Sequence, residues 1–162
     1  MIAAMALALS LSAGCPLEMA HYQLRSMPKT IAGFRQVPKT ADWPNGIAFY
    51  IHIGKIKRTF WFLPYSGNGQ GIGTHLASTT DVDAPGWLPP DPDSGEHRPL
   101  GDTDYLGADA KYNFDQAFHM YSGQPAAAHL FLPQLQEVFW YRVEPKVGMP
   151  MAFFDLTSCG NK

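Results

Sequence analysis

The chain has 162 residues, of which 46% are hydrophobic and 16% are charged, and its formal net charge is −2. This length argues for one domain, and the apolar share is enough to fill one hydrophobic core. A nucleic-acid partner is disfavoured, because binders of that class carry clustered cations, and the densest basic run here is only Lys55, Lys57 and Arg58.

The first 14 residues have the character of an export signal. The stretch 2–14 is uncharged and consists of small and apolar residues. It is shorter than the roughly 20 residues of a transmembrane helix, but it has the length and the small-residue end of a signal-peptide apolar region. The alternative is a buried N-terminal helix. We therefore expect a signal peptide over 1–14, a single mostly-β domain over 15–162, and export to the periplasm or cell envelope of a bacterium.

The end of this segment, Leu11-Ser12-Ala13-Gly14-Cys15, resembles the lipobox of bacterial lipoproteins. The resemblance covers these five residues. It implies that Cys15 is acylated and becomes the new N-terminus after cleavage, which would attach the protein to a membrane. An ordinary signal peptidase could instead cleave after Ala13.

The two cysteines, Cys15 and Cys159, bracket nearly the whole domain. In an oxidising compartment this spacing predicts a disulfide, since the ends of a single domain often lie close together. The two interpretations of Cys15 exclude each other, because an acylated cysteine has no free thiol and would leave Cys159 unpaired. We favour the disulfide.

Short strands dominate the first half of the domain. We expect strands over 17–25 and 31–37, followed by a hairpin whose strands, 47–53 and 58–63, are β-branched and aromatic. A glycine-rich loop over 64–73 leads to a strand over 74–82. The segment 84–99 contains five prolines, which excludes regular structure and predicts a long exposed loop.

The second half is harder to assign. The aromatic residues of 102–121 fit both a strand period and a helix period, and we favour strand. Segments 127–132 and 138–143 are expected to pair as a hairpin, and 152–156 to form a last strand. The expected fold is therefore an antiparallel β-sandwich or small barrel of about eight short strands, with room for one short helix.

The sequence contains no recognisable catalytic or cofactor motif. The glycines of the loop alternate at positions 67, 69, 71 and 73, which is not the spacing of a dinucleotide fingerprint. The run Asp91-Pro92-Asp93-Ser94-Gly95-Glu96 departs from the EF-hand pattern, and no two histidines have the spacing of a zinc site on one helix. We expect no cofactor and no metal.

Aromatic content points to binding. Trp87 lies in the proline-rich loop, and an exposed tryptophan is a frequent anchor for ligands or partners, whereas Trp61 and Trp140 are expected in the core. With Trp87 we take Tyr65 and His75 as the ligand-binding candidates. The favoured hypothesis is a non-enzymatic exported domain that binds a small molecule, a glycan or an envelope protein through loops at one end of the β-structure.

Two alternatives remain open at this stage. The first is a secreted hydrolase whose site is assembled from separate strands, with His75, Asp81, Asp83 and His119 as candidates. The second is a structural envelope lipoprotein, which requires acylation of Cys15.

Overall fold

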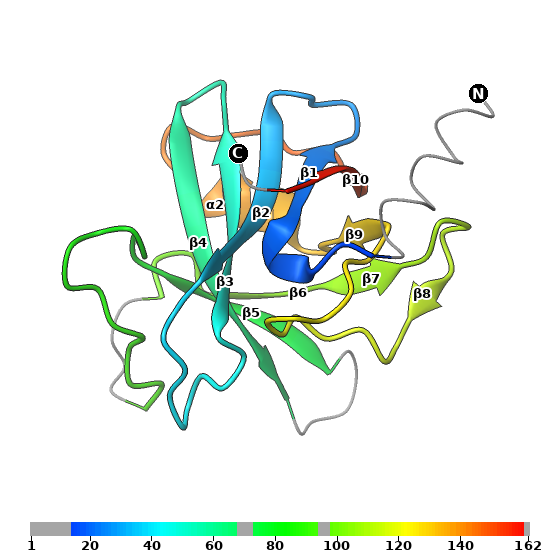
Figure 1. Cartoon of the computed structure of the whole chain (residues 1–162). Coiled ribbons are helices and arrows are strands. Elements are labelled where there is room, and N and C mark those ends of the chain that lie inside the picture. The colour runs from blue at the N-terminus through cyan, green and yellow to red at the C-terminus, as the bar shows by residue number, and fades with distance from the viewer. Residues whose placement is uncertain (1–13, 68–72, 94–97, 161–162) are drawn as a thin grey trace.

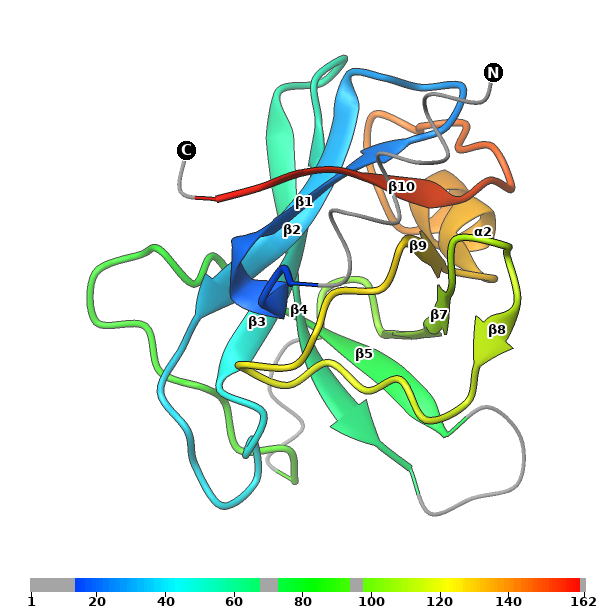
Figure 2. The same cartoon turned by 45° about the vertical axis from the view of Figure 1, so that its right-hand side comes forward.

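The computed structural model describes residues 14–67, 73–93 and 98–160, and these form one antiparallel sheet of ten strands with one α-helix. The strands are β1 (Ala20–Leu24), β2 (Thr30–Gln36), β3 (Ile47–Ile53), β4 (Arg58–Ser66), β5 (Thr74–Thr79), β6 (Asp102–Asp104), β7 (Leu106–Ala108), β8 (Phe114–Asp115), β9 (His129–Phe131) and β10 (Phe154–Cys159). Their order in the sheet is β6-β5-β4-β3-β2-β1-β10-β9-β7-β8. The sheet is curled into a half-barrel (Figures 1 and 2). The predicted signal peptide lies outside the described residues except for Gly14.

A single extended segment joins the two arms of the curled sheet. Only Tyr105 separates β6 from β7, yet β6 pairs with β5 while β7 pairs with β9 at the far side of the strand order. The expected mostly-β antiparallel fold is confirmed. Of the two expected architectures, the single curled sheet corresponds to the barrel rather than the sandwich, with ten strands instead of about eight.

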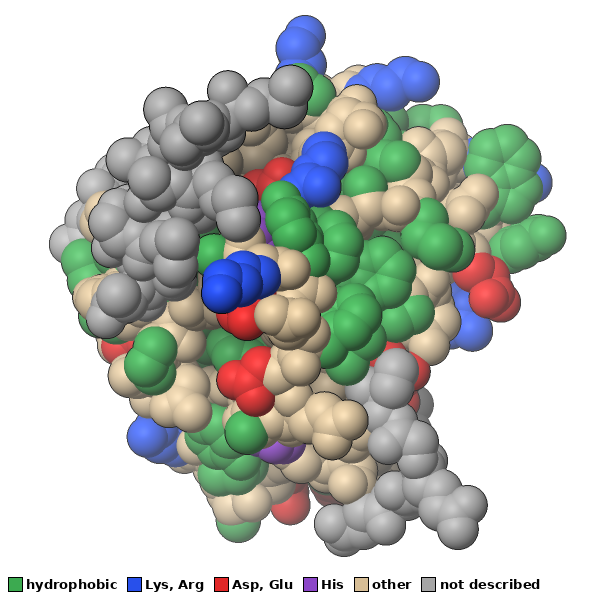
Figure 3. Space-filling view, turned by 90° about the vertical axis from the view of Figure 1, so that its right-hand side faces the viewer, with side chains coloured by type: hydrophobic (Ala, Val, Ile, Leu, Met, Phe, Trp, Pro, Cys, Tyr) green, Lys and Arg blue, Asp and Glu red, His purple; other side chains and the backbone are tan. Residues whose placement is uncertain are grey.

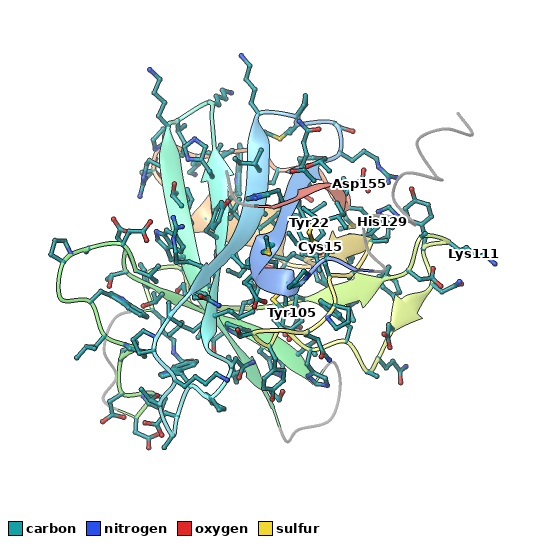
Figure 4. All side chains as sticks on the ribbon, viewed as in Figure 1. Cys15, Tyr22, Tyr105, Lys111, His129 and Asp155 are labelled. Atoms are coloured by element: carbon teal, nitrogen blue, oxygen red, sulfur yellow. A yellow bond between two sulfur atoms is a disulfide. The ribbon has the colours of Figure 1, made fainter. Side chains whose placement is uncertain are left out.

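The main core fills the concave side of the sheet. In β1, residues Ala20, Tyr22 and Leu24 are buried while the residues between them are half-buried, which is the period-two pattern of a strand with one face on a core. The phenol of Tyr22 is fully enclosed and donates a hydrogen bond to the carbonyl of Ala127 at 2.8 Å. Tyr22 and Tyr105, both buried members of this core, are labelled in the middle of the molecule in Figure 4.

A second, smaller apolar cluster covers the convex side of the sheet. Its buried members are Trp43, Ala48, Trp61, Leu63 and Ala77, with Trp87 among the partly buried residues packed against it. The indole N–H of Trp43 donates to the carbonyl of Pro90 at 2.6 Å, which fastens the loop after β2 to the proline-rich loop. The described part of 84–99 is irregular, as predicted, but it packs against the sheet.

The strands predicted in the first half of the domain are present in the structure. The hairpin over 47–53 and 58–63 is confirmed as β3 and β4, which pair in register from Ile53–Arg58 to Phe49–Phe62. The strands predicted over 17–25, 31–37 and 74–82 are found as β1, β2 and β5, the first preceded by a 3₁₀ turn, η1 (Leu17–Met19).

The hairpin predicted from 127–132 and 138–143 is wrong. Its first half contains β9, but the second half belongs to the helix α2 (Leu135–Tyr141). Leu135, Val138 and Phe139 share one helix face and are buried, and this packing outweighs the strand preference of their side chains. Both edges of β9 are already occupied, by β7 and β10, so no edge is free for another strand.

Two further expectations need correction. Trp140 is not in the core, because it lies on the outer face of α2 with 47% of its surface exposed, whereas Trp61 is buried as expected. The segment 102–121 is neither one strand nor one helix. It holds the short strands β6, β7 and β8 and irregular connections, and Tyr112 within it has a φ of +65°. Among the described residues no helix has the length and apolar character to cross a membrane.

Cys15 and Cys159 form the predicted disulfide, with Cα atoms 5.8 Å apart and a sequence separation of 144. Cys159 pairs with Ala20 at the end of the β1–β10 ladder, so the bond closes the chain where its first and last strands meet. The bond occupies the sulfur of Cys15, and in this form that residue has no thiol for acylation. The disulfide thus belongs to the unacylated alternative.

The disulfide is expected to supply a large part of the stability. Replacing both cysteines, as Cys15→Ala with Cys159→Ala, should lower the free energy of unfolding by about 3–5 kcal/mol, because a loop of this length loses much entropy when it is closed in the unfolded chain. Urea denaturation followed by tryptophan fluorescence measures the loss, and reduced wild-type protein is the matched control. A loss below about 1 kcal/mol in both samples would contradict this entropic role.

Candidate functional site

The most distinctive surface of the molecule is a cluster of aromatic rings beside β7, β8 and β9. The aromatic face, as we call it, consists of Tyr112, Phe114, Phe131 and Phe153. Tyr112 is 43% exposed and Phe114 is 49% exposed. Figure 3 shows hydrophobic side chains gathered over the middle of this side of the molecule. An exposed group of large rings is uncommon on a domain that binds nothing there.

A polar network lies beneath the rings. Asp155 of β10 accepts two hydrogen bonds from the guanidinium of Arg25, at 2.7 and 2.9 Å, and a third from Nδ1 of His129 at 2.7 Å. His129 and Asp155 are directly opposed across β9 and β10, and Figure 4 shows them side by side. Arg25 follows the end of β1, so three adjacent strands of the sheet supply the network.

The network holds Tyr112 in place. Arg25 donates to the Tyr112 hydroxyl at 2.8 Å and lies 5.1 Å from the centre of its ring. The ring stacks on His129 with centroids 4.2 Å apart and planes inclined by only 18°. The ring therefore has a fixed position although nearly half of its surface is exposed.

A tight turn presents Tyr112 to this network. The carboxylate of Asp109 accepts from the backbone N–H of Lys111 and of Asn113, at 2.8 and 3.0 Å. Hydrogen bonds from Asn113 are the largest influence that lowers the pKa of Asp109. Left-handed backbone such as that of Tyr112 is unusual for a bulky residue, and strained positions of this kind cluster at functional sites.

The pKa shifts within the network favour the charged forms of Asp155 and Arg25. Burial raises the pKa of Asp155, but the hydrogen bonds from His129 and Arg25 and the nearby positive charge outweigh burial, and the pKa is lowered overall. The hydrogen bond to Asp155 is the main reason that the pKa of Arg25 is raised. Both oxygens of Asp155 are occupied, so the carboxylate has a positioning role within the network.

Two of the residues predicted to bind ligand, Tyr65 and His75, do lie together. They are opposed across β4 and β5, with ring centroids 5.1 Å apart. Tyr65 donates to Asp102 at 3.0 Å, and burial followed by this bond raises its pKa. His75 bonds Asp104 at 2.6 Å.

Beside this pair, hydrogen bonds with Gln134 hold β6, the strand at one end of the sheet. The side chain of Gln134 donates to the carboxylate of Asp104 at 2.7 Å and accepts from the backbone N–H of the same residue at 2.9 Å. Gln134 thus satisfies polar groups on β6, the strand at one end of the sheet. A methyl group at Gly67 would lie 2.6 Å from Nε2 of His75, so little space remains around that nitrogen.

The third predicted ligand-binding residue, Trp87, lies elsewhere. It is half-buried and packs against the cluster on the convex side, where its proline-rich loop covers the sheet. Its neighbour Leu88 is the exposed apolar residue of this loop, at 71%.

The four residues of the hydrolase alternative do not form one site. His119 is within 3.3 Å of the Ser66 hydroxyl, whereas His75 pairs with Asp104. Ser66 is opposed to Thr74, so it points to the other face of the sheet from His75. Asp81 and Asp83 line a separate cleft after β5.

The aromatic face could not be predicted from the sequence, because the polar network that supports it joins residues 25, 129 and 155. Nothing in the chain places these positions together until β10 lies between β1 and β9. The one local signal is the Asp109–Asn113 turn, in which a tyrosine is carried between two turn-forming residues.

We compared the chain with known proteins in three ways. No protein-family model matches it, and neither the search of curated proteins nor the search of solved structures found a significant match. The function proposed below therefore rests on the residues and their geometry alone.

The network predicts a specific acid response. A carboxylate whose pKa is lowered in the folded state stabilises the protein above its unfolded pKa, near 3.9, and this contribution is lost as the pH falls through the folded value. Asp155→Asn should therefore cost about 1–2 kcal/mol at neutral pH and reduce the loss of stability between about pH 4 and pH 2.

Urea denaturation at a series of pH values tests this expectation. Asp83→Asn is the control at neutral pH, because it breaks an ion pair with Arg35 whose side chains are about half exposed and should cost less than about 1 kcal/mol. Parallel stability curves for the wild type and Asp155→Asn over the acid range would show that the lowered pKa of Asp155 does not stabilise the fold.

Proposed function

We propose that this domain is an exported, non-enzymatic interaction module that binds a polypeptide partner of the cell envelope through its aromatic face. The observation that carries the proposal is the combination of exposed rings with a polar network that is already satisfied. The ring of Tyr112 is held in position by Arg25 and His129, which also bond Asp155, and the ring of Phe114 packs against Phe131 and Phe153. A ligand would gain most by covering the rings with apolar surface.

The shape of the aromatic face favours a polypeptide over a flat sugar ring. Phe131 and Phe153 are inclined by 45° to each other, and Tyr112 and Phe153 by 58°. These tilted rings form a surface with relief, into which the side chains of a partner can interdigitate. Tyrosine, phenylalanine and arginine are also the residues enriched at the centres of protein interfaces.

A groove next to the rings extends the apolar surface. It has a volume of about 580 Å³ and is lined by Pro133, Trp140, Tyr141 and Met151 among others. Met151 comes two residues before Phe153, and Pro133 comes two residues after Phe131, so the two chain segments that carry these rings also line the groove. The groove gives a partner chain that covers the rings further apolar side chains to contact.

The binding proposal is tested with a photo-crosslinking amino acid in place of Met151, in cells that export the protein. We expect one discrete adduct, and purified wild-type domain added to permeabilised cells should compete with its formation. Purified Phe114→Ala should compete about tenfold less well, a loss of roughly 1.4 kcal/mol, because a ring at the centre of the interface is removed. Leu88→Ala, which removes an exposed side chain on the proline-rich loop, is the matched control and should compete as the wild type does.

Equal competition by Phe114→Ala and wild type would refute the role of the aromatic face. The absence of a discrete adduct at position 151, with the exported protein present and folded, would refute a polypeptide partner.

The export part of the proposal rests on the disulfide and on the character of residues 1–14, and intact mass tests it. Protein recovered from a bacterial host should have lost that segment and should gain two hydrogens on reduction, since the Cys15–Cys159 bond forms outside the cytoplasm. A lipid-sized increment on Cys15 would instead establish the acylated form and exclude the disulfide. An unprocessed chain with free thiols would contradict export.

A further inference from the structure

A second cleft, separate from the aromatic face, lies where β4 begins and β5 ends. Its volume is about 680 Å³. Three cations line it, namely Lys57, Arg58 and Arg142, together with the hydroxyl residues Thr79 and Thr80. These residues come from the β3–β4 turn, from the start of β4, from β5 and its end, and from the segment after α2, so the fold brings together positive charges that are far apart in the chain.

The two arginines of the cleft differ from the other arginines of the chain. The other three, Arg25, Arg35 and Arg98, each form an ion pair with an aspartate. Arg58 instead donates to the carbonyl of Glu144 at 2.8 Å, and Arg142 donates to the carbonyl of Leu100 at 2.8 Å. Within the described part of the chain, neither guanidinium takes part in an ion pair with a carboxylate, so each keeps an uncompensated charge and further N–H donors.

The position of Arg142 depends on a glycine. Gly101 has a φ of +68°, a left-handed conformation that favours glycine, and a Cβ at this residue would lie 1.8 Å from Nη1 of Arg142. The guanidinium therefore lies directly over Gly101 and is held there by the carbonyl of Leu100. Arg58 is similarly constrained, because its guanidinium lies 4.8 Å from the centre of the Phe60 ring. Both donors are held in place before any ligand arrives.

Two carboxylates also line the cleft, but only one of them stands against the cations. Asp83 is neutralised by Arg35, at 2.9 Å. Asp81 accepts a hydrogen bond from the backbone N–H of Asp83 and belongs to none of the ion pairs among the described residues. Three cations therefore face one uncompensated carboxylate, and the cleft is positive although the chain as a whole carries a net charge of −2.

We propose that this cleft is an oxyanion-binding site, in which Arg58 and Arg142 bind a phosphate or carboxylate group of a ligand. The planar fork of N–H donors on each guanidinium matches two oxygens of such a group, and Lys57 adds a compact charge. Thr80, which is exposed, adds a hydroxyl donor at the same cleft. The group belongs either to a small free anion or to an anionic polymer, since both present the same chemistry.

Isothermal titration calorimetry with inorganic phosphate at low salt tests the site in the purified wild-type domain. We expect saturable binding with one phosphate per chain, at least tenfold weaker in Arg142→Gln and in Arg58→Gln. Lys111→Gln is the matched control, because it removes one positive charge from the turn beside the aromatic face, and it should bind as the wild type does. Tighter binding of a polyphosphate chain than of phosphate would identify a polymer as the ligand source, and equal binding would identify a small anion.

Asp81→Asn keeps the test decisive even where an arginine variant is unstable. Removal of the one uncompensated carboxylate should tighten phosphate binding several-fold, an effect that loss of structure cannot produce. The proposal is overturned if phosphate does not bind, if Lys111→Gln weakens binding as much as Arg142→Gln, or if Asp81→Asn leaves the affinity unchanged.

Discussion

The pairing of the last strand with the first holds the two arms of this sheet together. β10 lies between β1 and β9, so without it the order would separate into β6-β5-β4-β3-β2-β1 on one side and β9-β7-β8 on the other. The short segment from β6 to β7 would still join them, together with hydrogen bonds that connect the segment 120–127 to residues 15–22 and to Asn45. The Cys15–Cys159 bond lies at the end of the β1–β10 ladder and fixes this junction covalently. A contact between residues so far apart in the chain closes a long loop at a high entropic cost, and a covalent link between such residues is expected to stabilise most.

The aromatic face follows from the same junction. Asp155 is opposed to His129 on one side of β10 and to Gln23 on the other, and Arg25 reaches it from the end of β1. Phe153 directly precedes β10, and its carbonyl accepts from the backbone N–H of Arg25 at 2.9 Å. Docking of the last strand therefore completes both the sheet and the proposed binding surface. A chain in which β10 is unpaired would lose the surface before it lost the local β3–β4 hairpin.

This dependence explains how much the sequence could predict. The β3–β4 hairpin was predictable because its strands are adjacent in the chain and its turn residues are explicit. The disulfide was predictable because the chain contains only two cysteines. The helix over 135–141 was not, since Val138 and Phe139 have strand preferences and only the occupied edges of β9 exclude a further strand. The candidate sites were not predictable either, because each joins residues that only the curled sheet brings together.

The arginines fall into two groups according to their partners. Those paired with an aspartate support the fold, and those bound to a backbone carbonyl keep donors for a ligand. Arg25 connects the end of β1 to β10, Arg35 connects β2 to the loop after β5, and Arg98 binds Asp102 of β6. Each of these three neutralises a carboxylate, and the first two thereby join segments that are far apart in the chain.

Arg58 and Arg142 also join segments, but they do so through backbone carbonyls, which leave the positive charge in place. Holding a guanidinium by a neutral acceptor fixes its direction without neutralising it. In a chain with only 16% charged residues, two such groups line one cleft, and each keeps N–H donors that its carbonyl acceptor does not use. An anion from outside the chain is the partner that this arrangement lacks.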